Sequence, residues 1–207
     1  PANVPGWNGN WTNVSSQCME GYGITFNAWQ EAKNAPVGLS EVSLQGFYRI
    51  LRDQTAYDMY LNGEQTCPAS VYVNNNESGM KCVFDEPELC GNVYTAGEAW
   101  ADADSLNWYP NTMKSAGEAF TAGKYVASAS GVVAREGDSF VLGVKGALPT
   151  DTWAIWDNFR LYYWGFNATR MLPHLQTAIE AGKANLEKSI TKDVYELVNA
   201  AIAMLTG

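Results

Sequence analysis

The chain has 207 residues, a length that suits one substantial domain with room for an appendage. Its formal net charge of −9 argues against partners such as nucleic acid or anionic membrane surfaces. No apolar run reaches membrane-spanning length, so we expect no direct insertion into a membrane. With eight Trp, eleven Tyr and seven Phe, the chain has more aromatic rings than its core needs, and we expect some at the surface.

The first well-defined strand is predicted between Glu41 and Arg49, where side chains alternate between two faces. One of these faces carries four side chains, namely Ser43, Gln45, Phe47 and Arg49. The next strand is predicted at Tyr57–Leu61, because Asn62-Gly63 directly after it is a strong hairpin signal. The long stretch from Asn74 to Ala119 is predicted to be irregular, apart from a weak helical pattern at Ser115–Phe120.

Short strands separated by Gly, Pro and Asn turns continue to about Gly165. They are predicted at Val71–Val73, Tyr125–Val133, Phe140–Val144 and Trp153–Trp164. In the last strand, alternation places four residues on one inward side, namely Ile155, Phe159, Leu161 and Tyr163. No long helix intervenes, so the pattern predicts an all-β fold, an antiparallel β-sandwich or jelly roll, over residues 1–165.

After Gly165 the period of the apolar residues changes to about 3.6, which is typical of helices. Pro173 suits the first position of a helix that runs to about Lys188, and Thr191 can cap a second helix. We therefore expect residues 166–207 to form a short two-helix segment, the start of a helical linker or bundle.

The cysteines Cys18, Cys67, Cys82 and Cys90 lack the spacing of a zinc site. Disulfides Cys82–Cys90 and Cys18–Cys67 are one possible pairing, and reduced thiols are an equal alternative. His174 is the only histidine, which argues against Ser-His-Asp or Cys-His catalysis.

Several segments carry a resemblance to a known family. They are Pro36–Leu39 with Val42–Arg49, Trp108–Met113 with Ala116–Phe120 and Gly123–Tyr125, and Leu142–Lys145 with Trp153–Tyr163. They occur in the same order in secreted modules of Bacteroidetes, and the chain resembles their galactose-binding-like, jelly-roll carbohydrate-binding modules from about Phe26 to Gly165.

This resemblance implies non-catalytic binding of a polysaccharide or oligosaccharide by a secreted or cell-surface protein. It also implies covalently linked domains in the parent chain, such as a glycoside hydrolase or polysaccharide lyase. Two alternatives stay open. The chain itself is a glycosidase or lyase that uses paired carboxylates, or it is a structural spacer without a ligand.

A sugar site needs flat aromatic rings for the apolar C–H faces and planar polar side chains for the hydroxyl groups. We expect it where the polar strand face meets the loop aromatics, at Ser43, Gln45, Arg49, Trp100, Trp108 and Tyr109. The alternatives are a solvated or loop-covered strand face and a small core beneath the loop. Trp7, Trp11 and Trp153 mark the next place to search.

Asp157 is the candidate metal ligand. Alternation places it on the predicted inward side with Ile155 and Phe159, where a carboxylate must be neutralised or hydrogen-bonded. The resemblance implies a structural calcium near the last strand, and carboxylate oxygens suit that ion. The alternative is a buried carboxylate that accepts backbone N–H groups.

Overall fold

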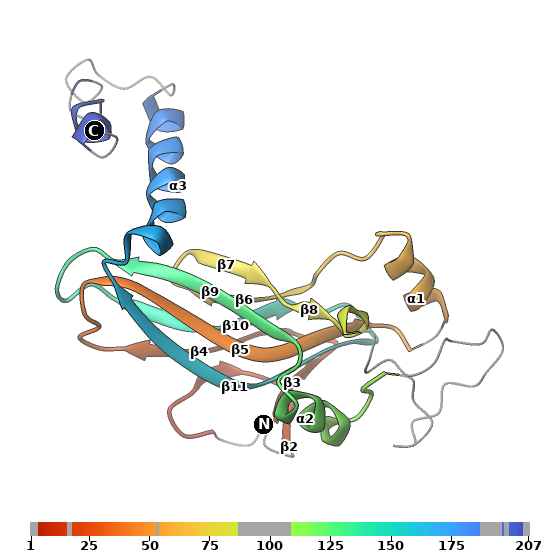
Figure 1. Ribbon diagram of the computed structural model, residues 1–207. Helices are drawn as coiled ribbons and strands as arrows, with labels where there is room; N and C mark the ends of the chain where they lie inside the picture. Colours follow the sequence, from red (N-terminus) through yellow and green to blue (C-terminus); the bar gives the residue numbers. More distant parts are fainter. Residues whose placement is uncertain are drawn as a thin grey trace.

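The structure is a computed structural model, and it describes residues 4–15, 18–52, 54–86, 109–186, 196 and 199–204. Two sheets pack face to face (Figure 1). The five-stranded sheet has the order β1 (Asn8–Asn10), β4 (Thr25–Ala32), β10 (Phe140–Ala147), β6 (Ala69–Val73) and β7 (Asn76–Gly79). The six-stranded sheet contains β2 (Asn13–Ser15), β3 (Cys18–Tyr22), β11 (Thr152–Gly165), β5 (Gly38–Ile50), β8 (Lys81–Cys82) and β9 (Val126–Val133).

The strands of the described residues pair antiparallel, except that β8 runs parallel to β5. The predicted antiparallel β-sandwich is thereby confirmed. β5 is central to its sheet, because it pairs with β11 on one side and with β9 and β8 on the other. Between the two sheets, the ring of Phe26 stacks on Trp156 with a centroid distance of 4.9 Å and an interplanar angle of 9°. Both residues belong to the buried core.

A second apolar layer lies on the outer face of the six-stranded sheet. It forms around Phe47, whose ring contacts Phe120, Tyr125 and Trp153 at centroid distances of 5.9, 4.6 and 5.4 Å. Phe120 belongs to helix α2 (Met113–Thr121), which covers this end of the sheet (Figure 1). The face predicted to be polar is therefore buried where Phe47 lies.

Helix α2 confirms the weak helical pattern at Ser115–Phe120, and it begins two residues earlier. Its start is defined by a reciprocal cap, because Thr112 Oγ1 accepts from the N–H of Ser115 at 3.1 Å. Ser115 Oγ in turn accepts from the N–H groups of Thr112 and Asn111 at 3.0 and 3.1 Å. A capped end of this kind directs the chain before the helix onto a definite path.

The strand predicted at Tyr57–Leu61 is wrong, since these residues belong to helix α1 (Gln54–Leu61). Tyr57 and Tyr60 are three residues apart, so they share a helix face, and both rings lie 5.3 Å from Phe84 of the short helix η1 (Val83–Asp85). Gly63 has a φ of 68°, and its N–H donates to the carbonyl of Tyr60. Asn62-Gly63 therefore ends a helix instead of turning a hairpin.

A β-bulge in β11 breaks the alternation predicted for the last strand. Asp157 pairs with Gln45 and Arg160 pairs with Ser43, so β11 has one more residue than β5 over this interval. Asn158 in the bulge has a φ of 56°. Ile155 consequently lies on the α2 side of the sheet, opposite Phe47, whereas Phe159 contacts Trp7 and the core.

Further along β11, Leu161 and Tyr163 are 53 % and 52 % exposed, so the prediction that they face inward is wrong. Asp157 is also not on the core side. It shares the outer face with its neighbour Gln45, because the bulge follows it.

Strand β11 ends at Gly165, and helix α3 (Ala168–Leu186) follows. The helix begins five residues before Pro173, so the prediction of Pro173 as its first residue is wrong. Asn167 supplies the cap instead, since its Oδ1 accepts from the N–H of Arg170 at 3.1 Å. α3 extends away from the sandwich (Figure 1), and His174 Nε2 lies 2.9 Å from Ser130 Oγ.

In the region of the second predicted helix, residues 196 and 199–204 are helical, and the remainder lies outside the described residues. In the part of the chain that the structure describes, no helix is both long and apolar enough to cross a membrane. Cys18, Cys67 and Cys82 carry thiols, so the Cys18–Cys67 disulfide is not formed. Cys90 lies outside the described residues.

We predict that Phe26→Ala destabilises the protein by about 3–5 kcal/mol, because it removes the ring stacked on Trp156 and leaves a cavity. Urea unfolding measures the effect. The matched control is Phe166→Ala, at a phenylalanine that is 72 % exposed, which should change the free energy of unfolding by less than about 0.5 kcal/mol. Equal losses for the two variants would contradict a core centred between the sheets.

Candidate functional site

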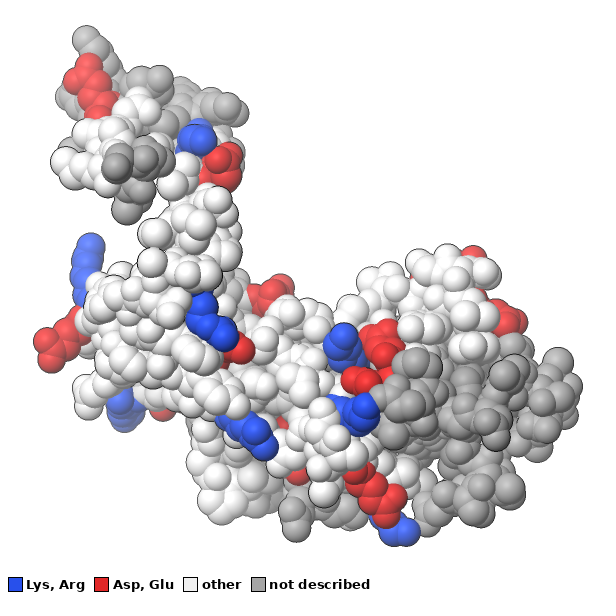
Figure 2. Space-filling model, in the orientation of Figure 1, with Lys and Arg blue, Asp and Glu red and all other residues white. Residues whose placement is uncertain are grey.

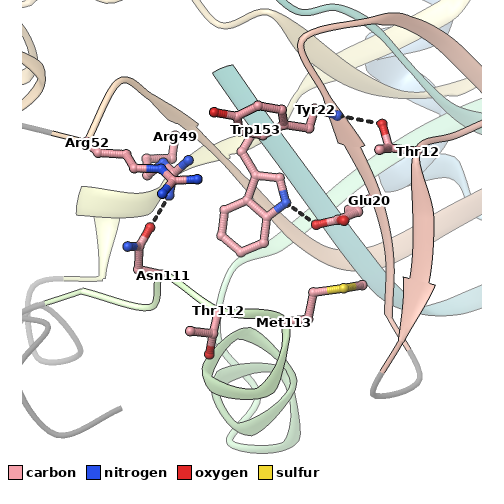
Figure 3. A pocket seen from close by; sticks show the side chains of 9 residues that line it. All are labelled: Thr12, Glu20, Tyr22, Arg49, Arg52, Asn111, Thr112, Met113 and Trp153. Carbon is pink, nitrogen blue, oxygen red and sulfur yellow. Dashed lines mark hydrogen bonds between the residues drawn. The ribbon is translucent and has the colours of Figure 1, made fainter. Parts of the chain in front are cut away.

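A pocket of about 330 Å³ lies where β3, β11 and β5 meet the segment that leads into α2 (Figure 3). Its walls combine aromatic, guanidinium, amide, hydroxyl and carboxylate groups. The lining residues are Thr12, Glu20, Tyr22, Arg49, Arg52, Asn111, Thr112, Met113 and Trp153. We call this the Arg49 pocket.

One row of side chains across three neighbouring strands forms the floor of the Arg49 pocket. Trp153 of β11 is directly opposite Tyr22 of β3 on one side and Arg49 of β5 on the other. Side chains directly opposite in a sheet lie on the same face and close enough to touch. The pairing of the strands therefore brings a phenol, an indole and a guanidinium into one line.

Arg49 is held rigidly although it is charged and only 2 % exposed. Its guanidinium carbon lies 5.1 Å from the centre of the Trp153 ring, which is a cation–π arrangement. Its Nη1 donates a hydrogen bond to Asn111 Oδ1 (Figure 3). A buried charge needs such partners, and here they also orient the planar fork of the guanidinium.

Glu20 holds the opposite edge of the indole. Trp153 Nε1 donates to Glu20 Oε2 at 2.6 Å, so the ring is fixed between a carboxylate at its edge and a guanidinium on its face. Tyr22 is anchored as well, since its hydroxyl donates to Asp151 Oδ1 at 2.9 Å. The second arginine, Arg52, has its guanidinium carbon 5.9 Å from the centre of the Tyr22 ring. The site is therefore built on strands and is largely pre-organised.

The structure separates the residues that the sequence proposed for a ligand site. Arg49 lines the pocket, but Gln45 lies deeper along β5, where it donates to the carbonyl of Lys124 and accepts from Asn158. Ser43 lies further still, opposite Arg160. Tyr109 is buried against Phe84, edge to face with centroids 5.6 Å apart.

Trp100 and Trp108 lie outside the described residues, so their part in a site stays a prediction. Trp153, named in the sequence as a second place to search, is central to the Arg49 pocket, whereas Trp7 contacts Phe159 elsewhere. Sequence reasoning missed Glu20, Tyr22 and Asn111. Only the pairing of β3 with β11 could have identified the first two, because nothing in their local sequence marks them.

A second, larger hollow of about 630 Å³ lies over the five-stranded sheet. Its polar side chains bind one another: Lys145 forms an ion pair with Glu77 at 2.9 Å, and Glu77 accepts from Ser70 at 2.9 Å. Lys145 also lies over the ring of Tyr72, 5.2 Å from its centre. Because Lys145 and Glu77 neutralise each other and Phe26, the aromatic side chain in this lining, is buried in the core, the Arg49 pocket is the stronger candidate.

The candidate metal ligand Asp157 is half-buried on the outer face of the six-stranded sheet. Burial raises the pKa of its carboxyl, and the N–H of Asn158 opposes this in part. Among the residues that the structure describes, no three His, Cys, Asp or Glu side chains gather as a metal site. Calcium binding at Asp157 stays a prediction.

No protein-family model matches the chain, and no curated protein matches it in sequence. The function of the pocket is therefore inferred from its geometry.

Substitution of Asp157 distinguishes a calcium ligand from a buried carboxylate that accepts backbone N–H groups. Because its pKa in the folded state is raised above the ordinary value of 3.8, the ionised carboxylate destabilises the fold at neutral pH. This penalty disappears as the pH falls through the raised pKa. We predict that Asp157→Asn raises the urea midpoint at pH 7 and that the gain is lost below pH 3.8.

The matched control is Asp58→Asn at an exposed position of α1, which should show no such gain. If Asp157 is a calcium ligand, its substitution should lower the stability of the protein. Asp157→Asn would then lower the melting temperature in calcium, and a chelator would lower the melting temperature of the unsubstituted protein.

Proposed function

We propose that the chain is a non-catalytic carbohydrate-binding module with a galactose-binding-like jelly-roll fold. In this proposal, it directs a larger secreted or cell-surface protein, with covalently linked glycan-degrading domains, to a polysaccharide or oligosaccharide. The observation that carries the proposal is the Arg49 pocket, where aromatic rings and planar polar groups converge on rigid strands.

The chemistry of the pocket suits a sugar. A pyranose ring has apolar C–H faces that pack on aromatic rings, and Tyr22 and Met113 supply such surfaces. Its hydroxyl groups need donors and acceptors in fixed directions, which Asn111, Arg49 and Thr12 supply. The volume of about 330 Å³ accommodates one or two sugar rings and leaves the rest of a chain outside.

The small number of carboxylates that line the pocket favours binding without hydrolysis. A glycosidase of the usual kind needs two carboxyl groups about 5–10 Å apart across the scissile bond. Among the described residues that line the pocket, Glu20 is the single carboxylate, and its Oε2 accepts from the indole of Trp153. This supports a binding site over the alternative of an enzyme with paired carboxylates.

Affinity electrophoresis against a panel of polysaccharides, followed by calorimetry with an oligosaccharide of the retained glycan, tests the proposal. We predict that Tyr22→Ala weakens binding roughly tenfold, because a stacked ring contributes about 1–2 kcal/mol. The control is Tyr163→Ala, at an exposed tyrosine at the far end of β11, which should leave the affinity unchanged.

Circular dichroism establishes that both variants are folded. Retention by no polysaccharide, or equal affinities for the two variants, would overturn the proposal. Release of reducing sugar by the unsubstituted protein would replace it with an enzymatic function.

A further inference from the structure

The Arg49 pocket has two arginines in its lining, although the chain is acidic. The chain has a formal net charge of −9, yet two arginines, Arg49 and Arg52, line this one pocket. On the face seen in Figure 2, Lys and Arg side chains are scattered singly, and several lie next to Asp or Glu. A pocket that gathers two guanidinium groups within an acidic protein is suited to an anionic ligand.

The opposite charges in the pocket lie on different sides of Trp153. Figure 3 shows both guanidinium groups on the side of Asn111, whereas Glu20 lies beyond the indole, at the ring nitrogen. The carboxylate of Glu20 is directed to that nitrogen by the 2.6 Å hydrogen bond. The part of the pocket between Asn111 and Tyr22 therefore holds both guanidinium groups, and the carboxylate of Asp151 lies at its edge, where it accepts from the hydroxyl of Tyr22.

Two further features favour an oxyanion at this place. Asn111 lines the pocket with an amide whose Oδ1 accepts from Arg49 and whose Nδ2 is a hydrogen-bond donor. Thr112 and Met113 at the start of α2 line the same pocket, and the first turn of a helix carries partial positive charge. These features add to the two arginines and do not by themselves define a site.

We propose that the Arg49 pocket selects an anionic saccharide, whose oxyanion binds to Arg49 and Arg52 while its ring packs on Tyr22. The oxyanion is the carboxylate of a uronic acid or a sulfate ester, since the fork of a guanidinium binds both. This inference rests on the proposed carbohydrate-binding function, and it adds the class of glycan.

The test uses matched pairs of glycans that differ only in charge. The acidic probes are polygalacturonate, alginate, glucuronoxylan and κ-carrageenan. Each is paired with its neutral form, carboxyl-reduced for the first three and desulfated for the last. Binding of the full chain is measured by calorimetry, and we expect at least one acidic probe to bind roughly tenfold more tightly than its neutral form.

Arg52→Gln is the informative variant, because Arg52 is exposed and its replacement should not impair folding. We expect it to remove most of the preference for the acidic probe, measured as the ratio of the affinities for the acidic and neutral forms in the same variant. The control is Arg135→Gln, which removes the same charge at an exposed turn between β9 and β10 and should keep the preference.

The outcomes separate this inference from the proposed function. Binding of neutral and acidic forms with equal affinity, or an unchanged preference in Arg52→Gln, would overturn the inference and leave carbohydrate binding intact. Failure of every probe, acidic and neutral, would overturn both. A preference confined to uronates or to the sulfated probe would identify the oxyanion.

Discussion

The antiparallel pairing of β5 with β11 is the constraint on which the rest of the structure depends. It places Trp153 directly opposite Arg49, and the pairing of β11 with β3 places Tyr22 on the other side of the same indole. A slip of either pairing by one residue would send Arg49 or Tyr22 to the opposite face of the sheet. The Arg49 pocket therefore exists only in this register.

The register is supported from both faces of the six-stranded sheet. On the core side, Trp156 lies opposite Gly46 and stacks on Phe26 of the other sheet. On the outer side, Phe47 packs beneath α2 against Phe120 and Tyr125. Because both faces are covered at this end, the strands that carry the pocket residues are fixed before any ligand arrives, which lowers the entropic cost of binding.

Helix α2 also decides which part of the outer face is accessible. It covers the strand at Phe47, and its capped N-terminus places Asn111 and Thr112 beside Arg49. The pocket thus forms at the rim of the helix. The same arrangement separates the opposite charges of the pocket. The guanidinium of Arg49 lies over the face of the indole, and the carboxylate of Glu20 accepts from the indole nitrogen.

Much of the fold could be predicted from the sequence, since strand alternation depends only on neighbouring residues. The strands around Glu41–Arg49 and Phe140–Val144 and the change to helix after Gly165 are examples. Helix α1 could not be predicted, because its aromatic residues suit a strand or a helix until Phe84 packs on one face of the helix.

The bulge at Asp157 could not be predicted either, since it is a property of two paired strands. The same limit applies to the site. Arg49 could be predicted because alternation places its planar hydrogen-bonding side chain on the polar strand face, but the same argument applied equally to Gln45 on that face. Glu20 and Tyr22 become visible only when β3 lies beside β11.

The most direct test of the central claim is an NMR titration that follows the eight tryptophan indole N–H signals during addition of a bound glycan. The signal of Trp153 is assigned by its loss in Trp153→Phe. We predict that this signal shifts saturably, with the same Kd as calorimetry, while that of Trp164, whose indole donates to Glu41 at the other end of β11, stays in place. A stationary Trp153 signal at saturating glycan, with shifts elsewhere, would contradict the assignment of the Arg49 pocket as the binding site.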